Sequence, residues 1–313
     1  MRILVVGAGA VGGYFGGRLL EAGRNVTFLV RPGRAALLAK HGLTIRSPLG
    51  DYHRDDPPIV THQALAQPFD LVLLSCKAFD LEPAMTSFAP AVGENTAILP
   101  LLNGVRHLDL LADRFGAKPL LGGQCVISAT LGDNGAIVHF NDMHSLSFGE
   151  LDGSRSARVE AAAAELVGAA GFEARLSTEI RQEMWEKWVF IASAAGIGCL
   201  MRASVGDYCA AGASGLATGL LDECAAIAAG QGYPPRPAAL ARARAILTTA
   251  ESPLKPSMLR DIEGGKPVEG DQILADLLSR AAKPDQCPLL KIATLHVRAY
   301  EIQRARAGTA ANG

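Results

Sequence analysis

Residues 2–12, RILVVGAGAVG, decide the fold class that this chain is expected to adopt. A short apolar run typical of a buried strand leads into a Gly-x-Gly-x-x-Gly pattern, and helix-compatible residues follow from about Ala10 to Glu21. Between a strand and a helix this pattern is the dinucleotide-binding fingerprint, because its glycines permit a tight turn, close approach of a pyrophosphate and close helix–strand packing. We therefore predict a Rossmann-type unit at the start of the chain. The turn residues expected to contact the cofactor are Gly7, Ala8, Gly9, Ala10, Val11 and Gly12.

Similar strand-like runs alternate with helical patterns through the first half of the chain. The runs at residues 25–30, 70–76 and 95–101 are typical of β-α-β units in a parallel sheet that is covered on both faces. Residues 43–60 contain a turn-like Pro-Leu-Gly-Asp, so this stretch is either two short strands decorating the sheet or a surface loop. Further on, Asp133-Asn134-Gly135 indicates a hairpin, which we expect to extend the sheet on one side.

The second half of the chain has a different pattern. After residue 176 long helical segments follow one another without strand alternation, over residues 178–200, 204–231, 237–249, 272–281 and 288–304. We therefore expect an α/β protein in which an N-terminal Rossmann-type parallel-sheet domain, residues 1–173, binds NADP. An all-α C-terminal domain, residues 174–313, is expected to follow it and to carry the substrate and catalytic residues.

Composition narrows the class of protein further. The 313 residues contain 30 Lys plus Arg against 31 Asp plus Glu, so no charge excess favours nucleic acid or an anionic membrane as partner. The six cysteines occur singly, which disfavours a disulfide framework or a zinc site and favours a reducing compartment. The uncharged run at residues 188–201 is shorter than the roughly 20 residues of a membrane span, and no signal peptide precedes the first strand. We expect a cytoplasmic protein with no bound metal, no membrane span and no nucleic-acid partner.

The end of the second strand predicts which dinucleotide is bound. NAD sites place an acidic residue there for the ribose 2′-hydroxyl, whereas this strand is followed by Arg31 and then Arg34. A guanidinium at Arg31 suits a 2′-phosphate, so NADPH is the predicted cofactor. The alternative is that both arginines are solvated loop residues.

Several motifs together resemble the ketopantoate reductases, or 2-dehydropantoate 2-reductases, over nearly the whole chain. They are GAGAVGGYFGGRL at residues 7–19, Arg31, CKAF at 76–79, LNGV at 102–105, WEK at 185–187, PSMLRD at 256–261, and Glu269. The resemblance implies hydride transfer from NADPH to a small 2-oxo acid in a cleft between a Rossmann domain and a helical domain. Ketopantoate, reduced to pantoate in pantothenate biosynthesis, is the first candidate substrate.

The resemblance also implies roles for individual residues. Lys187 matches the catalytic lysine, whose ammonium stabilises the charge that grows on the carbonyl oxygen and then donates a proton. Asn103 is placed against nicotinamide and substrate, although an Asn-Gly pair alone would indicate only a turn. Ser257 matches the hydroxyl that binds the substrate carboxylate, with helix capping as its alternative. Glu269 would bind the cofactor ribose or orient the reacting groups, and Lys77 and Ala129 would line the cofactor cleft. Solvent-exposed surface residues are the alternative for Lys187 and Glu269.

Three positions depart from the family pattern. The family's substrate-binding asparagines, one and two turns after the lysine and further on before a glycine, are here Ile191, Ala195 and Val205. A buried polar substrate group without a partner costs ~1–3 kcal/mol. We therefore expect either a less polar 2-oxo acid as substrate or binding amides from elsewhere in the chain.

Other readings stay open on the sequence. One is another NADP-dependent hydroxy-acid dehydrogenase of similar architecture; a 6-phosphogluconate type is disfavoured because the first helix of the second half offers few basic residues beyond Arg181, Lys187 and Arg202. Another is that the glycine-rich turn serves packing alone and binds no nucleotide. A third is a non-catalytic NADPH sensor, which would not need Lys187, Ser257 and Glu269 together. The sequence does not decide whether the apolar helices pack within one chain or against a second copy in a homodimer.

Overall fold

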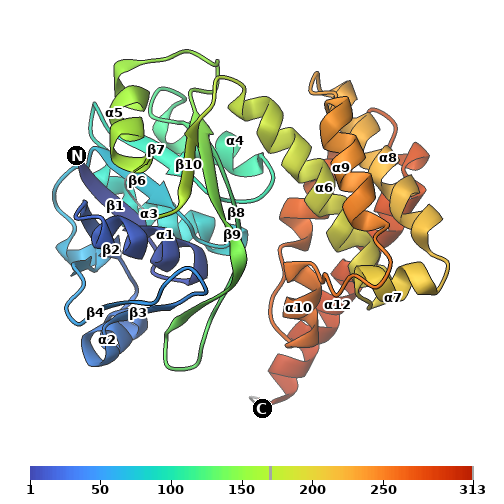
Figure 1. Ribbon diagram of the computed structural model, residues 1–313, viewed down its shortest axis with the longest axis horizontal. Helices are drawn as coiled ribbons and strands as arrows, with labels where there is room; N and C mark the ends of the chain where they lie inside the picture. The colour runs from blue at the N-terminus through green and yellow to red at the C-terminus, as the bar shows by residue number, and fades with distance from the viewer. Residues whose placement is uncertain (169–170, 312–313) are drawn as a thin grey trace. The chain divides into compact units, whose positions relative to one another are not determined.

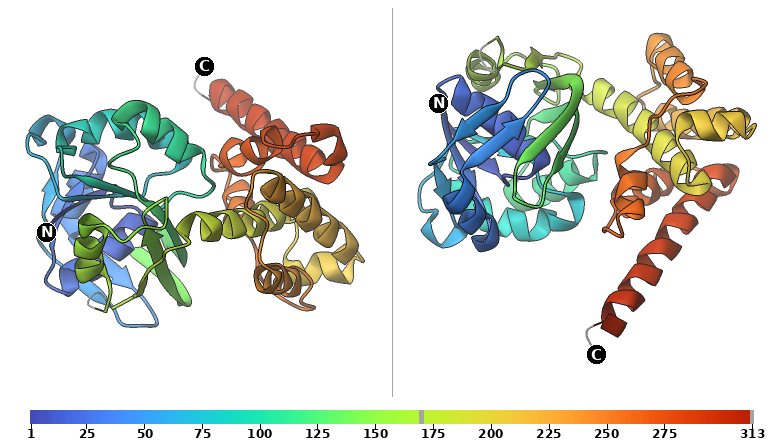
Figure 2. Two further views of the ribbon diagram at one scale, coloured as in Figure 1. Left: turned by 90° about the horizontal axis from the view of Figure 1, so that it is seen from above. Right: turned by 60° about the horizontal axis from the view of Figure 1, so that its bottom comes forward.

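The computed structural model describes residues 1–168 and 171–311, with side chains described up to residue 307. The chain divides into two compact units, Met1–Arg181 and Gln182–Gly313 (Figure 1, Figure 2). We had expected the division between residues 173 and 174. The structure places it later, because strand β10 (Glu173–Leu176) pairs with β9 (Ile137–Gly149) of the first unit.

A parallel five-stranded sheet forms the centre of the first unit, as expected. Its strand order is β5-β2-β1-β6-β7, and every pair along it is parallel. Four of its strands are almost entirely buried, which explains their continuous apolar sequences. The bounds are β1 (Arg2–Val6), β2 (Asn25–Leu29), β5 (Ile59–Val60), β6 (Leu71–Leu74) and β7 (Ala97–Pro100).

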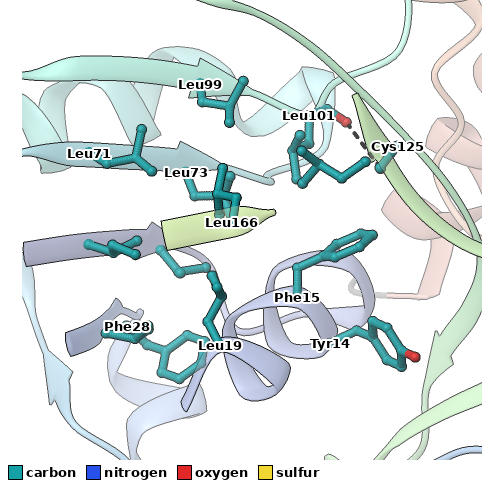
Figure 3. Close-up of a cluster of buried hydrophobic side chains, with 14 of the residues drawn as sticks. Tyr14, Phe15, Leu19, Phe28, Leu71, Leu73, Leu99, Leu101, Cys125 and Leu166 are labelled. Carbon is teal, nitrogen blue, oxygen red and sulfur yellow. Dashed lines mark hydrogen bonds between the residues drawn. The ribbon is translucent and has the colours of Figure 1, made fainter. Parts of the chain in front are cut away.

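Alternate residues of β1 belong to two different hydrophobic clusters. Ile3 and Val5 pack in a cluster that contains Phe15 of helix α1, drawn in Figure 3, whereas Leu4 and Val6 pack in a second cluster. Since successive side chains of a strand point to opposite faces, helices cover both faces of this sheet. The helices of the first unit are α1 (Ala10–Glu21), α2 (Pro32–His41), α3 (Leu81–Phe88), α4 (Arg106–Phe115) and α5 (Ala157–Leu166), with short 3-10 turns η1 (His62–Ala64), η2 (Ala78–Asp80) and η3 (Ala89–Ala91).

The predicted hairpin is present, but the expectation that it extends the central sheet was wrong. Strands β8 (Gly122–Leu131) and β9 form it, and β9 pairs in parallel with β3 (Leu43–Arg46) in a second sheet. β3 and β4 (Tyr52–Arg54) are antiparallel, so residues 43–60 form strands rather than a plain loop. Just before the hairpin, Leu120 forms a parallel bridge with Ile98 of β7, and Gly123 of β8 packs closely on Leu99 and Pro100 of β7.

Helix α1 explains why the second sheet forms where it does. A Cβ on Gly16 would lie 2.5 Å from Phe28 of β2, and a Cβ on Gly13 would lie 2.5 Å from Ile137 of β9. A Cβ on Gly17 would lie 2.7 Å from Ile45 of β3. The glycines of α1 therefore let strands of both sheets pack closely on the same helix.

The second unit is all-α, as expected, with differences in its divisions. The segment expected as one helix at residues 204–231 is two, α7 (Val205–Ala210) and α8 (Ser214–Gly230), because Gly212 turns the chain with a φ of +84°. Helix α10 (Ser257–Glu263) was not among the long helical segments expected, although the capping alternative for Ser257 implied a helix start here. The remaining elements are α6 (Ile180–Met201), α9 (Pro237–Leu247), the π-helix η4 (Asp271–Ala275), α11 (Asp276–Ser279), the 3-10 turn η5 (Pro284–Gln286) and α12 (Pro288–Ala311).

Candidate active site

The expected cofactor residues of the first unit lie where its parallel strands end. The glycine turn follows β1, Arg31 follows β2, Lys77 follows β6 and Asn103 follows β7. Because these strands are neighbours and run in one direction, the four features lie along the same edge of the sheet, where open α/β sheets bind ligands. Ala129 is in the second sheet instead, next to an irregularity in β8 between Ile127 and Ala129.

The glycine turn has the backbone geometry that a bound pyrophosphate needs. Gly7 has a φ of +94°, and its N–H donates to the carbonyl of Leu29 at 2.9 Å. A Cβ on Gly12 would lie 2.0 Å from Ser75 Oγ, so only glycine permits this approach of α1 to β6. A Cβ on Gly9, in contrast, meets nothing within 4 Å among the described residues, so the helix start is open above this residue. The first turn of α1 carries no acidic side chain, so it fits a phosphate group.

The two arginines after β2 have different partners. Arg31 is largely exposed and donates from Nη2 to Asp80 Oδ1 at 2.6 Å. Arg34 donates to the carbonyl of Ala8 and to that of Gly135 in the β8–β9 turn, both at 2.9 Å. Burial lowers the pKa of Arg34. Arg34 therefore links the glycine turn to the hairpin. Arg31, in contrast, pairs with the Asp80 carboxylate at the protein surface.

In the second unit, the side chains on either side of Lys187 on α6 are held by contacts with other parts of the unit. Glu186 accepts two hydrogen bonds from the Arg236 guanidinium at 2.7 Å each. Burial would raise the pKa of Glu186, but Arg236 more than offsets this and the pKa is lowered, so the carboxylate stays charged. Trp185 stacks on Tyr233 with centroids 5.5 Å apart, and Trp188 donates from Nε1 to the carbonyl of Ile273 at 2.9 Å. Lys187 itself is half-buried.

Glu269 lies two residues before the π-helix that Trp188 contacts. Its side chain is 9% exposed, and its backbone carbonyl accepts from Ile273 N–H at 2.9 Å. The next residue, Gly270, packs so closely on α12 that a Cβ would lie 2.4 Å from Val297. π-Helices are rare in proteins, and those that occur are often found at functional sites. The Trp188–Ile273 hydrogen bond thus connects the helix of Lys187 with the turn that follows Glu269.

Ser257 is the first residue of α10 and is exposed, whereas the capping position is occupied by Pro256. Helix capping by its hydroxyl, the alternative raised by the sequence, is therefore not its role here. Pro256 packs on Gly198 of α6, where a Cβ would lie 2.8 Å from its ring. This contact places Ser257 beside the helix that carries Lys187.

The three positions that depart from the family pattern are apolar parts of the second unit. Ile191 is half-buried one turn after Lys187, while Ala195 is 3% and Val205 2% exposed. The backbone N–H of Val205 donates to the carbonyl of Leu254 at 3.0 Å. These positions contribute packing surface and no polar side chain.

Four residues that support the site were not foreseen. Ser75 packs on the glycine turn, Asp80 pairs with Arg31, Arg236 holds Glu186, and Trp188 reaches the π-helix. Ser75 and Asp80 had a usable signal, since both follow β6, a strand adjacent to β1. A hollow of about 800 Å³ beside α7 is lined by none of the expected site residues. Within residues 1–168 and 171–311, no cluster of His, Cys, Asp or Glu suits a metal, and no helix is long and apolar enough to cross a membrane.

Comparison with known proteins assigns the family. Residues 3–153 match the family described as Ketopantoate reductase PanE/ApbA, and residues 179–301 match its C-terminal part. The chain belongs to the ketopantoate reductase family. It is accordingly an oxidoreductase with the Rossmann-type and helical parts of that family.

Individual proteins and solved structures match most of the chain's length. A Bacillus subtilis protein described as an uncharacterized oxidoreductase is 35% identical over 97% of this chain and 100% of its own length. A 2-dehydropantoate 2-reductase of Mesorhizobium japonicum is 29% identical over 88% of this chain and 90% of its own. The structure of 2-dehydropantoate 2-reductase from Geobacter metallireducens superimposes with a TM-score of 0.86 at 28% identity, covering 96% and 99% of the two chains. D-mandelate dehydrogenase, solved with NADH and anilino(oxo)acetate, shares the fold with a TM-score of 0.87 at 22% identity over 97% and 99%.

Proposed function

We propose that this chain is an NADPH-dependent reductase that converts a 2-oxo acid to a 2-hydroxy acid. The observation that carries the proposal is the edge of the central sheet, where an open glycine turn and a basic residue after β2 stand together. A guanidinium pairs well with a phosphate, so Arg31 would bind the 2′-phosphate and the start of α1 the pyrophosphate. Lys77, Asn103, Ala129 and Glu269 are proposed to contact the rest of the cofactor.

The cofactor, when bound, supplies the hydride that reduces the carbonyl carbon. Lys187 then has two tasks at the carbonyl oxygen: its ammonium stabilises the developing negative charge, and it donates the proton that completes the hydroxyl group. The carboxylate of Glu186 stays paired with Arg236 and holds α6 in place. Asn103 and the Ser257 hydroxyl are proposed to bind the substrate's polar groups.

The apolar residues Ile191, Ala195 and Val205 favour a substrate less polar than ketopantoate. An amide that is absent cannot satisfy the substrate hydroxyl of ketopantoate, and the unpaired group would weaken binding by ~1–3 kcal/mol. D-mandelate dehydrogenase, which shares the fold, was solved with an aryl oxo acid. We therefore place branched aliphatic and aryl 2-oxo acids beside ketopantoate as candidate substrates.

The cysteines support a reducing compartment, and we propose the cytoplasm as location. All six are free thiols in the structure. Burial raises the pKa of Cys199 and that of Cys224 to about 12, so both stay protonated and unreactive.

The test is a steady-state assay of NADPH oxidation with the purified full chain. Ketopantoate and aliphatic and aryl 2-oxo acids are compared, each with NADPH and with NADH. The Lys187→Ala variant should lose at least about 100-fold in kcat while its NADPH Kd stays within about twofold, since a general acid contributes typically ~100- to 10,000-fold. Lys291→Ala, which removes an exposed lysine paired with Asp285, is the matched control.

The outcomes separate the readings. Turnover with ketopantoate would show that the three apolar positions do not exclude it, and turnover confined to less polar acids would identify an altered pocket. Full activity of Lys187→Ala would contradict its proposed role. Tight NADPH binding without turnover of any 2-oxo acid would favour the alternative of a non-catalytic NADPH sensor.

A further inference from the structure

The ion pair between Arg31 and Asp80 crosses the place where the cofactor is proposed to bind. Arg31 follows β2 and Asp80 ends the 3-10 turn η2 after β6. Strands β2 and β6 are the two neighbours of β1 in the sheet. The ion pair of 2.6 Å between Arg31 and Asp80 therefore passes across the carboxyl end of β1, where the glycine turn begins.

In this pair, the Asp80 carboxylate occupies the Arg31 guanidinium that a 2′-phosphate would bind. In dinucleotide sites the residue after the second strand meets the adenosine ribose, through a carboxylate for a free hydroxyl or through an arginine for a phosphate. Here the arginine is present, and the Asp80 carboxylate, at the end of the 3-10 turn after β6, already binds it. Arg34 cannot readily replace Arg31, because its Nε and Nη1 donate to Ala8 and Gly135.

The pair is also exposed enough to open. The Arg31 side chain is 69% and the Asp80 side chain 33% exposed, so water competes for both groups. Exposed ion pairs of this kind contribute little to stability. A phosphate carrying more than one negative charge can therefore displace the carboxylate from the guanidinium.

We propose that Asp80 sets the cofactor preference of this enzyme by competing with the 2′-phosphate of NADPH for Arg31. This inference rests on the proposed NADPH site. NADPH binds only after the Arg31–Asp80 pair opens, whereas NADH, which has no 2′-phosphate, binds with the pair intact. Asp80 thus lowers the preference for NADPH that Arg31 alone would confer.

The experiment measures the Kd of NADPH and of NADH by isothermal titration calorimetry, with no substrate present. Four proteins are compared with the wild type: Asp80→Asn, Arg31→Ala, the double variant, and Glu160→Gln. The last removes the same charge from another exposed ion pair, Arg155–Glu160, on the same unit. Asp80→Asn should tighten NADPH binding about three- to fivefold and leave NADH within about twofold, as expected for removal of one exposed charge pair.

Two further results complete the test. In the Arg31→Ala background, Asp80→Asn should change NADPH binding by less than about twofold, because the competition no longer exists, and Glu160→Gln should change neither Kd. Unchanged or weaker NADPH binding by Asp80→Asn, together with a loss of NADPH affinity in Arg31→Ala, would overturn the role of Asp80 and leave the NADPH site standing. If Arg31→Ala leaves the ratio of the two Kd values unchanged, the proposed cofactor site fails and the inference fails with it.

Discussion

Gly9 and Gly12 belong to one turn, yet a methyl group added at each would meet different surroundings. At Gly12 it would lie 2.0 Å from Ser75 Oγ and 2.3 Å from the carbonyl oxygen of Gly7, so the turn itself would have to move. At Gly9 it would point into open space. The backbone of Gly9, with φ −81° and ψ −161°, is one that alanine also adopts. Glycine is thus needed for packing at Gly12, and at Gly9 the structure gives no packing reason for it.

This difference predicts opposite phenotypes for two alanine variants. Gly12→Ala should lower the free energy of unfolding by about 1–3 kcal/mol, the usual cost of overpacking. Gly9→Ala should unfold like the wild type but bind NADPH at least about tenfold more weakly, because its Cβ would occupy the space of the pyrophosphate. Urea denaturation and calorimetric titration measure the two quantities. Wild-type NADPH affinity in Gly9→Ala would remove the glycine turn from the cofactor site.

Single residues of the site were predictable to different degrees. Arg31 and the glycines follow from local pattern, because a strand, a turn and a helix are adjacent in the sequence. Lys187 and Glu269 were expected only from the family resemblance, since a lysine or glutamate on a helix has no distinguishing pattern of its own. The pairing of Asp80 with Arg31 joins residues 49 positions apart, and it depends on the strand order of the finished sheet.

Among the elements, α6 and the π-helix η4 are joined through one indole. The N–H of Trp188 donates to the carbonyl of Ile273, and the indole is fully buried. Removing this donor would leave a buried carbonyl without it, which typically costs ~1–3 kcal/mol. The same contact positions the residues directly before the π-helix, including Glu269.

Trp188→Phe should therefore reduce both stability and catalysis. We expect the free energy of unfolding to fall by about 1–3 kcal/mol. We also expect kcat to fall by more than the fraction of unfolded protein alone would explain. Trp185→Phe, which keeps an aromatic ring against Tyr233, is the matched control. Equal kcat values for the two folded variants would show that the Trp188 hydrogen bond has no part in arranging the site.

A second link between elements depends on pH. Glu150, at the end of β9, accepts hydrogen bonds from Arg158 of α5 at 2.6 and 2.8 Å and from the Ser156 hydroxyl. Arg158 lowers the pKa of the Glu150 carboxyl below its ordinary 4.5, against the opposing effect of burial and with help from Ser156. The folded-state pKa lies below the unfolded one, so this stabilisation is present above about pH 4.5 and is lost as the pH falls through the folded-state pKa.

Glu150→Gln should accordingly be less stable than the wild type by about 1–3 kcal/mol near neutral pH. The difference should shrink as the pH is lowered below about 4.5, because the wild-type carboxylate is then protonated as well. Urea unfolding at neutral and acidic pH measures it, with Glu160→Gln as the control for an exposed pair. A difference that stays constant over this range would assign the effect to packing rather than to charge.

Elements were predictable where their signals are local. The helix at Ala10–Glu21, the parallel strands and the turn at Asp133-Asn134-Gly135 all follow from neighbouring residues. The second sheet was missed, because β9 pairs in parallel with β3 and β10, which come from distant parts of the sequence. The division of residues 204–231 at Gly212 was missed because a single glycine inside an apolar helical pattern is usually tolerated.

For the whole molecule, the two compact units allow ligand binding to be followed separately. The protein has two tryptophans, Trp185 and Trp188, and both belong to the second unit. The glycine turn and Arg31 belong to the first unit. Tryptophan fluorescence therefore reports unfolding of the second unit, whereas calorimetry reports both.

Adenosine 2′,5′-bisphosphate, the half of NADPH that carries the 2′-phosphate, should stabilise the first unit. At about 100 times its Kd it adds about 2.7 kcal/mol to the folded state, which raises Tm by about 5–10 °C for a unit of this size. We expect the calorimetric transition to rise while the fluorescence transition moves less. Adenosine without phosphates is the control, and a fluorescence transition that rises as much as the calorimetric one would contradict this expectation.

The order of strands in the second sheet also has a consequence for synthesis on the ribosome. β3 lies in the first third of the first unit, whereas β9 and β10 lie in its last third, and β9 pairs with both in parallel. The early strands thus leave the ribosome long before their partners exist, and the sheet becomes complete only once Leu176 has emerged. Until β9 has emerged, the apolar face of α1 that β9 covers is exposed in the nascent chain, so it is a surface on which chaperones would act.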